Sequence, residues 1–519
     1  MQMMKSNKNI EFNAAFDLIH ENSVKRPEKI AFIDDDNVIS YLELSNKVKS
    51  FAQSLYQTGL KKNDRVIICM DDCINFPIVF LGSIWAGIVP ICVNTMLQKN
   101  DLKYMIEDSE ANAIFCSNEL CNKFQEIKDT SKKEILIFSD NNLPSTAKEF
   151  NNNLSAMINS KALKSLPEKT YENTECFWLY SSGSTGRPKG TIHLHKSLKN
   201  TAVLYAKSIL KIQQEDVFFS AAKLFFAYGL GNALTFPMSV GGTSILSKQR
   251  PTVEIVIKKI INNKVTIFFG VPTLYAVLLN SNLNPDNFKS LRLAVSAGEA
   301  LPEHLCKKWI NLTGTEVLDG IGSTEMLHIF ISNSINNITP GSSGKPVPGY
   351  EVRLIKDDNT EAEVDEIGEL EVKGPTSAKA YWNKPEKTSA TFFGEWTKTG
   401  DKYIKNSKGV FKYCGRTDDM MKVSGQYVSP FEIEAALQSH PLVLEAAVVG
   451  KLNQDNLLKP KAYVVLNTDN DNKINQIETE LTNYIKNKLT PFKYPRWYEF
   501  VDSLPKTATG KIQRYKLRD

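Results

Sequence analysis

A loop rich in glycine and hydroxyl side chains follows an apolar run and constrains the fold more than any other stretch. Residues 176–180 read as a buried strand, and residues 180–190 continue it as YSSGSTGRPKG. Such a loop after a strand presents backbone N–H groups and hydroxyls in a concave nest that suits phosphate oxygens. Arg187 and Lys189 add positive charge where a polyphosphate is most negative. The loop therefore predicts a site for ATP or another phosphate-rich nucleotide.

The loop is not a Walker A sequence, because Lys189 is followed by Gly190 rather than by serine or threonine. A flexible surface loop is the alternative interpretation. Flexible linkers rarely end in Pro-Lys-Gly with an apolar strand immediately upstream, so the phosphate loop is favoured.

The length and charge of the chain set broad limits on its class. A chain of 519 residues is too long for one hydrophobic core and predicts several domains. Its 63 basic and 58 acidic residues leave a net charge of only +5, which gives no case for nucleic acid as a partner. The eight cysteines form no CxxC pair and no zinc-finger spacing, which favours reduced thiols in a cytoplasmic protein. Residues 1–13 lack the apolar core of a signal peptide.

One uncharged segment, residues 76–93, has about the minimum length of a membrane span. Pro77, Gly87 and Pro90 interrupt it. A buried helix, a turn and a short inner strand fit this pattern better, so we expect no membrane span.

The first 170 residues alternate between helical and strand patterns, which indicates βαβ units around a mostly parallel sheet. Residues 44–60 predict an amphipathic helix that ends at Gly59. Strands are expected at 64–70, 88–93, 111–117 and 134–139, and further along at 266–270 and 291–299. Open α/β sheets bind ligands at the carboxyl ends of their strands. Three such ends carry polar or glycine-rich residues, at 181–186, 296–302 and 319–325.

The pattern changes from about residue 345, where β-rich segments with tight turns begin. A compact α+β unit of helices and strands follows Gly425. We expect the boundary in the turn at 415–419, with domains at 1–417 and 418–519.

Five motifs, taken together, resemble the adenylate-forming superfamily of acyl-CoA synthetases, luciferases and peptide-synthetase adenylation domains. They are YSSGSTGRPKG, GIGSTE (320–325), TGD (399–401), GRTDDMMKVSG (415–425) and PKTATGK (505–511). The resemblance covers essentially the whole chain. It implies an α/β fold whose large N-terminal domain has mostly parallel sheets wrapped by helices, plus a β-rich subdomain. A small mobile α+β C-terminal domain is implied to carry the catalytic lysine.

The resemblance implies roles for individual residues. Glu325 is the expected Mg²⁺ ligand, Thr324 contacts the α-phosphate, Asp401 binds the ribose hydroxyls, and Arg416 donates to the ribose and phosphate side. The expected contacts with ATP and CoA are Ser181, Ser182, Gly183, Ser184, Thr185, Gly186, Lys189, Gly298, Glu299, Ala300, Asp319, Gly320, Ile321, Asp401, Arg416, Gly425, Gln426 and Tyr427.

Lys511 is expected to stabilise the five-coordinate transition state of adenylation. After adenylation the small domain is implied to swing about Asp418, so that Lys511 leaves. The face with Lys422 and Gly425 then closes to form a pantetheine tunnel. Lys422, Lys511, Thr324 and Glu325 are thus the expected catalytic residues. One residue departs from the family pattern, because Ile321 stands where a tyrosine often stacks on adenine; an apolar side chain can still cover the ring.

The acyl-pocket region, with the stretches 221–242, 268–276 and 322–333, resembles the benzoate-CoA ligase branch. The expected pocket residues are Phe226, Ala227, Tyr228, Gly229, Gly322, His328 and Ile329. Phe225 is expected to be core. Polar groups in an apolar pocket need a partner, so Tyr228 and His328 are expected to face the ligand.

The resemblance implies an ATP-dependent ligase that joins an aromatic acid, benzoate or a close analogue, to coenzyme A through an acyl-adenylate. AMP and pyrophosphate are the released products. Loading of a carrier protein in trans, a different small carboxylic acid and a luciferase-like oxygenase remain as alternatives. A non-catalytic nucleotide-binding protein is disfavoured, because Glu325, Asp401, Arg416 and Lys511 are all present. Monomer and homodimer both stay open.

Overall fold

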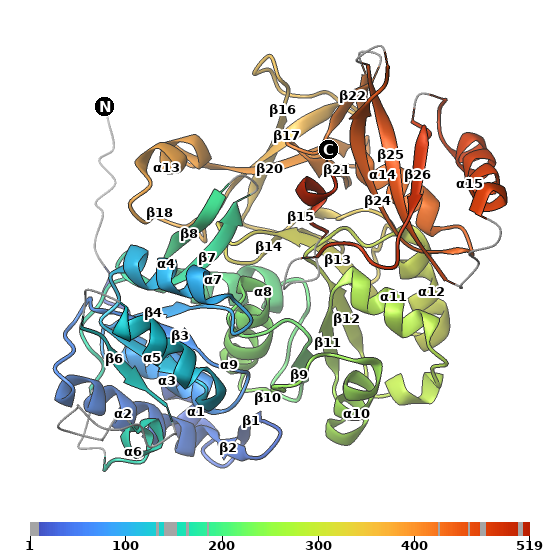
Figure 1. The fold of residues 1–519 in the computed structure, drawn as a ribbon. Coiled ribbons are helices and arrows are strands. Elements are labelled where there is room, and N and C mark those ends of the chain that lie inside the picture. Colours follow the sequence, from blue (N-terminus) through green and yellow to red (C-terminus); the bar gives the residue numbers. More distant parts are fainter. Residues whose placement is uncertain are drawn as a thin grey trace, which may run out of the picture.

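The computed structural model describes residues 10–130, 134–139, 153–161, 166–183, 186–423, 426–454, 457–467, 474–491, 493–506 and 512–518. Two large, mostly parallel sheets lie side by side, and an antiparallel sheet and a C-terminal α+β unit lie beyond them (Figure 1). This arrangement confirms the expected fold class.

The first large sheet has the strand order β18-β8-β7-β4-β3-β5-β6. Its strands are β3 (Arg65–Cys69), β4 (Val89–Cys92), β5 (Ala113–Cys116), β6 (Leu136–Phe138), β7 (Glu175–Gly183), β8 (Gly186–Leu194) and β18 (Ala380–Tyr381). The pairings among β3 to β7 are parallel, whereas β8 runs antiparallel to both β7 and β18. The helices of this region are α1 (Ala14–Lys25), α2 (Tyr41–Gln57), α3 (Asn75–Trp85), α4 (Lys99–Ser109), α5 (Cys121–Asp129) and α6 (Leu154–Ile158).

The second large sheet has the order β15-β14-β13-β12-β11-β9-β10-β1-β2. Its strands are β1 (Ile30–Ile33), β2 (Val38–Ser40), β9 (Val217–Ser220), β10 (Thr243–Ile245), β11 (Ile267–Gly270), β12 (Leu293–Ser296), β13 (Val317–Gly322), β14 (Ile329–Ser332) and β15 (Lys345–Pro346). The strands from β13 to β1 pair in parallel. The α-helices in this part of the chain are α7 (His195–Thr201), α8 (Ala227–Leu230), α9 (Phe236–Val240), α10 (Val253–Asn263), α11 (Pro272–Asn280) and α12 (Glu303–Thr313).

The expected β-rich region after residue 345 is present and forms an antiparallel sheet. It contains β16 (Glu351–Ile355), β17 (Ile367–Lys373), β19 (Phe392–Phe393), β20 (Trp396–Lys405) and β21 (Phe411–Arg416), with α13 (Pro385–Thr391) beside it. The C-terminal unit contains β22 (Met421–Val423), β23 (Gln426–Val428), α14 (Pro430–Gln438), β24 (Val443–Leu452), β25 (Leu458–Leu466), α15 (Ile474–Lys488) and β26 (Trp497–Phe500).

The uncharged segment at 76–93 divides as the sequence indicated. Helix α3 is buried along nearly its whole length, Gly87 adopts a positive φ of 67° in the following turn, and β4 is an inner strand. Within the described residues, no helix combines the length and the apolar character that crossing a membrane requires.

The glycine-rich stretch differs from the expected loop. Residues up to Gly183 extend β7, and β8 begins at Gly186, so most of the stretch belongs to an antiparallel hairpin. Ser181 lies opposite Lys189 in this pairing. The hairpin therefore places a hydroxyl and an ammonium group side by side. Ser184 and Thr185 lie outside the described residues.

Candidate active site

The β7–β8 hairpin, called the phosphate hairpin here because its residues 181–189 are the expected phosphate site, meets Glu325, which follows β13 of the other large sheet. Ser181 Oγ donates to Glu325 Oε1 at 3.2 Å, and the Tyr381 hydroxyl donates to the same oxygen at 2.7 Å. The Lys189 ammonium lies 4.1 Å from the centre of the Tyr381 ring. Burial lowers the pKa of Lys189, and the charge of Glu325 opposes that shift. A carboxylate, an ammonium and two hydroxyls from both sheets are thus gathered in one place.

Tyr381 was missed by the sequence analysis. It lies in the two-residue strand β18, which pairs with β8 although almost 200 residues separate the two strands in the sequence. Burial and the neighbouring Glu325 carboxylate raise the pKa of its phenol, so the hydroxyl remains a donor. No local motif marks this tyrosine, because only the strand pairing brings it to the hairpin.

A second charged pair lies at the β20–β21 pairing. Asp401 and Arg416 face each other in register, and Arg416 Nη1 donates to Asp401 Oδ1 at 3.1 Å. The same nitrogen donates to the Thr399 carbonyl at 2.9 Å. Gly400 adopts a φ of +72°, and a Cβ there would lie 2.7 Å from Arg416 Nη2. The glycine of Thr399-Gly400-Asp401 thus lets the Arg416 guanidinium pack against the backbone of this segment. The charge of Asp401 raises the pKa of Arg416.

The strand ends expected near the base and phosphates occupy the carboxyl ends of β12 and β13. Gly298 follows β12 with a φ of +97°, and Glu299 and Ala300 come directly after it. Asp319 is buried in β13, and this burial raises its pKa well above the usual range. Ile321 is half-buried on the same strand. Gly320 packs tightly, because a Cβ there would lie 2.8 Å from the Ile331 carbonyl oxygen.

Four of the expected acyl-pocket residues, Phe226 to Gly229, lie at the start of helix α8. Phe226 precedes the helix, and Ala227 and Tyr228 form its first turn; all three are half-buried. The Tyr228 hydroxyl lies 3.3 Å from the carbonyl oxygens of Gly270 and Val295, at the carboxyl ends of β11 and β12. Phe225 lies in the core, as expected.

Neither of the two glycines of the expected pocket has room for a side chain. A Cβ at Gly229 would lie 2.0 Å from the Lys223 carbonyl oxygen, and one at Gly322 would lie 2.6 Å from that of His328. Both positions therefore require glycine for close backbone approach.

His328 is buried among aromatic rings. Its ring centre lies 4.6 Å from that of Phe236 and 5.5 Å from that of Tyr228. Burial lowers its pKa to about 3, so the imidazole is neutral at pH 7. Its Nε2 lies 3.1 Å from Asn232 Oδ1. Asn232 is fully buried and was also missed by the sequence analysis, since an asparagine inside an apolar run carries no motif. Ile329 is 1% exposed and packs in the same hydrophobic cluster as Tyr205 and Phe236.

The hairpin β22–β23 carries Lys422 and Tyr427. The Tyr427 hydroxyl donates to Asp357, in the turn between β16 and β17, and Lys422 Nζ lies 3.6 Å from the same carboxylate. Lys402 Nζ donates to Asp357 Oδ1 at 2.9 Å. The bonds from Tyr427 and Lys402 lower the pKa of Asp357 to about 2. Lys422 and Tyr427, whose ammonium and ring lie 5.0 Å apart, thus both contact this turn.

The C-terminal segment joins the expected hinge. Arg518 Nη2 donates to the Asp418 carbonyl at 3.1 Å, and Arg514 Nη1 lies 3.5 Å from Asp419 Oδ2. Arg514 Nη2 also forms a 2.6 Å ion pair with Glu434 of α14. Lys511 and Gly425 lie outside the described residues, as do the side chains of Ser182 and Gln426.

Comparison with known proteins agrees with this geometry. Residues 19–382 match the AMP-binding enzyme family, and residues 432–511 match the AMP-binding enzyme C-terminal domain. The chain belongs to the AMP-binding enzyme family. The expected resemblance to adenylate-forming enzymes is thereby confirmed.

Characterised members of the AMP-binding enzyme family are similar to this chain over almost its full length. A benzoate–CoA ligase of Thauera aromatica is 49% identical over 98% of this chain and 96% of its own. A 4-hydroxybenzoate–CoA/benzoate–CoA ligase of Rhodopseudomonas palustris is 43% identical over 98% and 94%. The solved structure of a benzoate CoA ligase from Burkholderia xenovorans has a TM-score of 0.91 and 43% identity, with 98% of this chain and 100% of that chain covered. An anthranilate CoA ligase in complex with anthranoyl-AMP has a TM-score of 0.93 and 36% identity, with coverage of 98% and 97%.

The surroundings of Glu325 suit Mg²⁺ that would be held together with the phosphates of bound ATP. Within the described residues there is no cluster of three or more histidine, cysteine, aspartate or glutamate side chains that could hold a metal by itself. Glu325 offers one carboxylate next to the phosphate hairpin. Mg²⁺ is commonly bound by one or two carboxylates together with substrate phosphates and waters, so this donor set suits it.

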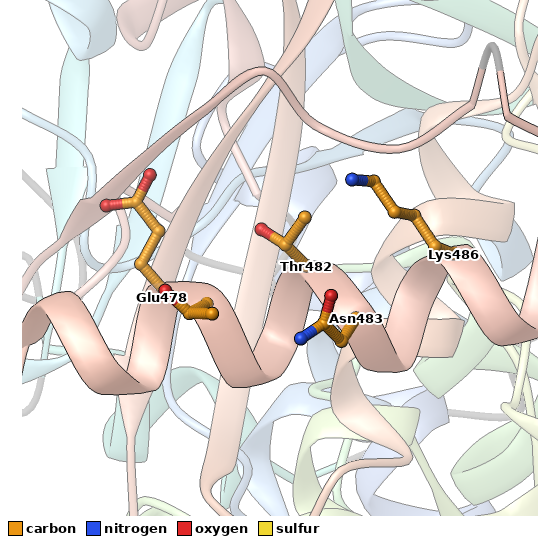
Figure 2. Close-up of a pocket in the computed structure, with 5 residues that line it drawn as sticks. Glu478, Thr482, Asn483 and Lys486 are labelled. Atoms are coloured by element: carbon orange, nitrogen blue, oxygen red, sulfur yellow. The ribbon is translucent and has the colours of Figure 1, made fainter.

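A surface pocket on the C-terminal domain lies apart from these groups. It is lined by Glu478, Thr479, Thr482, Asn483 and Lys486, all on helix α15 (Figure 2). Three of these residues recur at four-residue spacing and therefore share one helix face. None of them is an expected site residue of the family.

Proposed function

We propose that this protein is an ATP-dependent acid–CoA ligase that acts on an aromatic carboxylic acid, benzoate or a close analogue. The assembly of Ser181, Lys189 and Glu325 between the two sheets carries the proposal. The neutral, aromatic surroundings of Tyr228 and His328 support an aromatic acid. Full-length relatives named benzoate–CoA ligases support the same substrate class.

In the first step, a carboxylate oxygen of the acid attacks the α-phosphorus of ATP, and the bond to pyrophosphate breaks to leave acyl-AMP. Ser181 and Lys189 hold the β- and γ-phosphates, together with the rest of residues 181–186. Thr324 contacts the α-phosphate, and Lys511 stabilises the charge that develops there. Mg²⁺, when bound at Glu325, neutralises part of the phosphate charge.

Asp401 and Arg416 hold the ribose. Because Asp401 already accepts from Arg416 through Oδ1, its second oxygen can accept from a ribose hydroxyl. Ile321 and residues 298–300 cover the adenine.

In the second step, the CoA sulfur attacks the acyl carbon of acyl-AMP and AMP leaves. Residues 418–519 turn about Asp418, which removes Lys511 and brings the hairpin with Lys422 to the site. Gly425, Gln426 and Tyr427 then line the path of the pantetheine arm. Under this proposal residues 1–417 form the AMP-binding domain.

Phe226, Ala227, Tyr228, Gly229, Gly322, His328 and Ile329 form the acid pocket. Among these residues no side chain carries a charge at pH 7, since burial depresses the pKa of His328 to about 3. A buried ammonium would need a compensating charge, so this pocket disfavours amino acids. The enzyme acts on small molecules in the cytoplasm, as a monomer or a homodimer.

The order of product release tests the proposal. Protein with Mg-ATP and benzoate should release pyrophosphate and form benzoyl-AMP before CoA is added. Addition of CoA should then yield benzoyl-CoA and AMP. Formation of ADP and phosphate would contradict the mechanism, because it would place the attack at the γ-phosphate. Acetate and 2-aminobenzoate in parallel define the acid class, and a reaction that proceeds only with a carrier protein would favour that alternative acceptor.

A further inference from the structure

Asp108, in the last turn of α4, is a largely buried carboxylate outside the expected site. Its side chain is 7% exposed and lies close to three donors, one on β7, one on α4 itself and one just before α13. The Tyr180 hydroxyl donates to Oδ2 at 2.8 Å, the Tyr104 hydroxyl to Oδ1 at 3.1 Å, and Lys384 Nζ to Oδ1 at 3.3 Å. A buried carboxylate is tolerated only when its oxygens are bonded in this way, so its position is closely defined.

The hydroxyl donors connect Asp108 to both sides of the phosphate hairpin. Tyr180 immediately precedes Ser181 on β7. Pro188 immediately precedes Lys189 on β8. The Tyr104 hydroxyl lies 3.2 Å from the Pro188 carbonyl oxygen, so it is shared between this oxygen and Asp108 Oδ1. Two of the residues expected to hold the phosphates, Ser181 and Lys189, therefore directly follow positions that α4 contacts through Asp108 and Tyr104.

Strand β18 is attached to the same point. Lys384 pairs with the Asp108 side chain, and Trp382 Nε1 donates to the Asp108 carbonyl oxygen at 2.8 Å. Trp382 directly follows Tyr381, whose hydroxyl bonds Glu325. Asp108 therefore contacts the residues next to Ser181 and Tyr381 directly, and the residue before Lys189 through Tyr104.

We propose that Asp108 is a positioning residue for the β- and γ-phosphates of ATP, acting through Tyr180, Tyr104 and Lys384. This inference rests on the proposed function, because it assumes that the hairpin holds those phosphates. Asp108 does not support the ribose pair, since Asp401 and Arg416 lie on the separate β20–β21 pairing. Its loss should therefore weaken binding of ATP more than binding of AMP.

Two variants test the inference. Asp108→Asn keeps the shape but turns an NH₂ group toward hydroxyl or ammonium donors, and Tyr180→Phe removes one of those donors. Titration calorimetry should show the Kd for Mg-ATP raised about five- to tenfold in Asp108→Asn, and less in Tyr180→Phe, with the Kd for AMP unchanged. The KM for Mg-ATP in pyrophosphate release should rise likewise. Thioester formation from benzoyl-AMP and CoA should be retained, because it involves no β- or γ-phosphate.

Asp216 provides a matched control. Its side chain is 5% exposed, and Arg292 Nη2 donates to it at 2.6 Å. Asp216 directly precedes β9, so it lies at the end of that strand opposite to the site. Asp216→Asn should lower the melting temperature without changing the ratio of the two nucleotide Kd values.

An unchanged Kd ratio in Tyr180→Phe and in folded Asp108→Asn would overturn the inference. Equal losses in both half-reactions would do the same, because they would indicate a general structural role. If Asp108→Asn does not fold, Tyr180→Phe decides alone. Wild-type protein that binds neither nucleotide would overturn the proposed function and this inference together, whereas normal wild-type binding with an unchanged ratio overturns only the inference.

Discussion

His195 is a buried imidazole whose Nδ1 accepts the backbone N–H of Ala14 at 3.2 Å. Protonation would turn this acceptor into a donor. Burial, with a smaller effect of Lys62, lowers the pKa of His195 to about 4, compared with an unfolded value of about 6.5. As the pH falls, His195 is therefore protonated in the unfolded chain at a higher pH than in the folded protein. The stability that depends on neutral His195 is present above pH 6.5 and is lost as the pH falls toward 4.

We therefore expect His195→Gln to reduce the slope of unfolding free energy against pH by about 1.4 kcal/mol per pH unit between pH 6 and 4.5. Urea denaturation at several pH values measures this slope. His20→Gln is the control, because His20 lies exposed on α1. An identical slope in wild type and His195→Gln would show that His195 does not titrate in this way.

A larger side chain at Ala227 tests the acid pocket at the scale of one residue. It is half-buried at the start of α8, so a larger side chain would enter space beside the expected acid. Ala227→Leu should lower kcat/KM for benzoate about ten- to two-hundredfold and affect the smaller 2-furoate less. Ala233→Leu is the control, because Ala233 is 1% exposed in the core. That variant should lower the melting temperature and leave the ratio between the two acids unchanged, whereas the same behaviour in Ala227→Leu would remove Ala227 from the pocket.

Helix α2 begins three residues before the periodic pattern that predicted it, because Ser40 caps it. Ser40 Oγ accepts the Glu43 N–H at 3.3 Å, and Glu43 Oε2 accepts the Ser40 N–H at 2.9 Å, which completes a capping box. Ser40→Ala should destabilise the protein by about 1 kcal/mol without changing kcat. Thermal unfolding measures the loss, and Ser23→Ala, within α1, is the control. Equal melting temperatures for the two variants would show that the cap contributes nothing measurable.

Local signals in the sequence predicted most elements, whereas pairings between distant segments had to be observed. The strands at β3, β4, β5, β6 and β11 fall where apolar runs end in turns, because these signals act over a few residues. Residues 180–190 were expected as a loop after the strand at 176–180, since glycine is a poor strand former; the pairing of β7 with β4 and of β8 with β18 makes most of this stretch β-structure. Tyr381 and Asn232 were not predicted as site residues, because their partners Glu325 and His328 are distant in sequence.

At the scale of the whole molecule, the two half-reactions should depend on different faces of the C-terminal domain. Lys511→Ala should slow adenylation about 10²–10³-fold and largely spare thioester formation from benzoyl-AMP. Gly425→Leu should block the pantetheine path and spare adenylation. Pyrophosphate release and CoA thioester formation, assayed separately, measure the two effects. Equal losses in both assays for both variants would contradict a rotation about Asp418.

The parallel pairing of β1 with β10 has a consequence for folding during synthesis on the ribosome. Phe32 lies opposite Ser244, so one strand leaves the ribosome long before its neighbour exists. At about 5–20 residues per second, a separation of roughly 200 residues corresponds to a delay of about 10–40 s. For that interval the nascent chain carries an apolar strand with an unsatisfied edge, the kind of surface that chaperones bind and that aggregates recruit. We therefore expect the yield of folded protein to depend on the rate of synthesis as well as on the sequence.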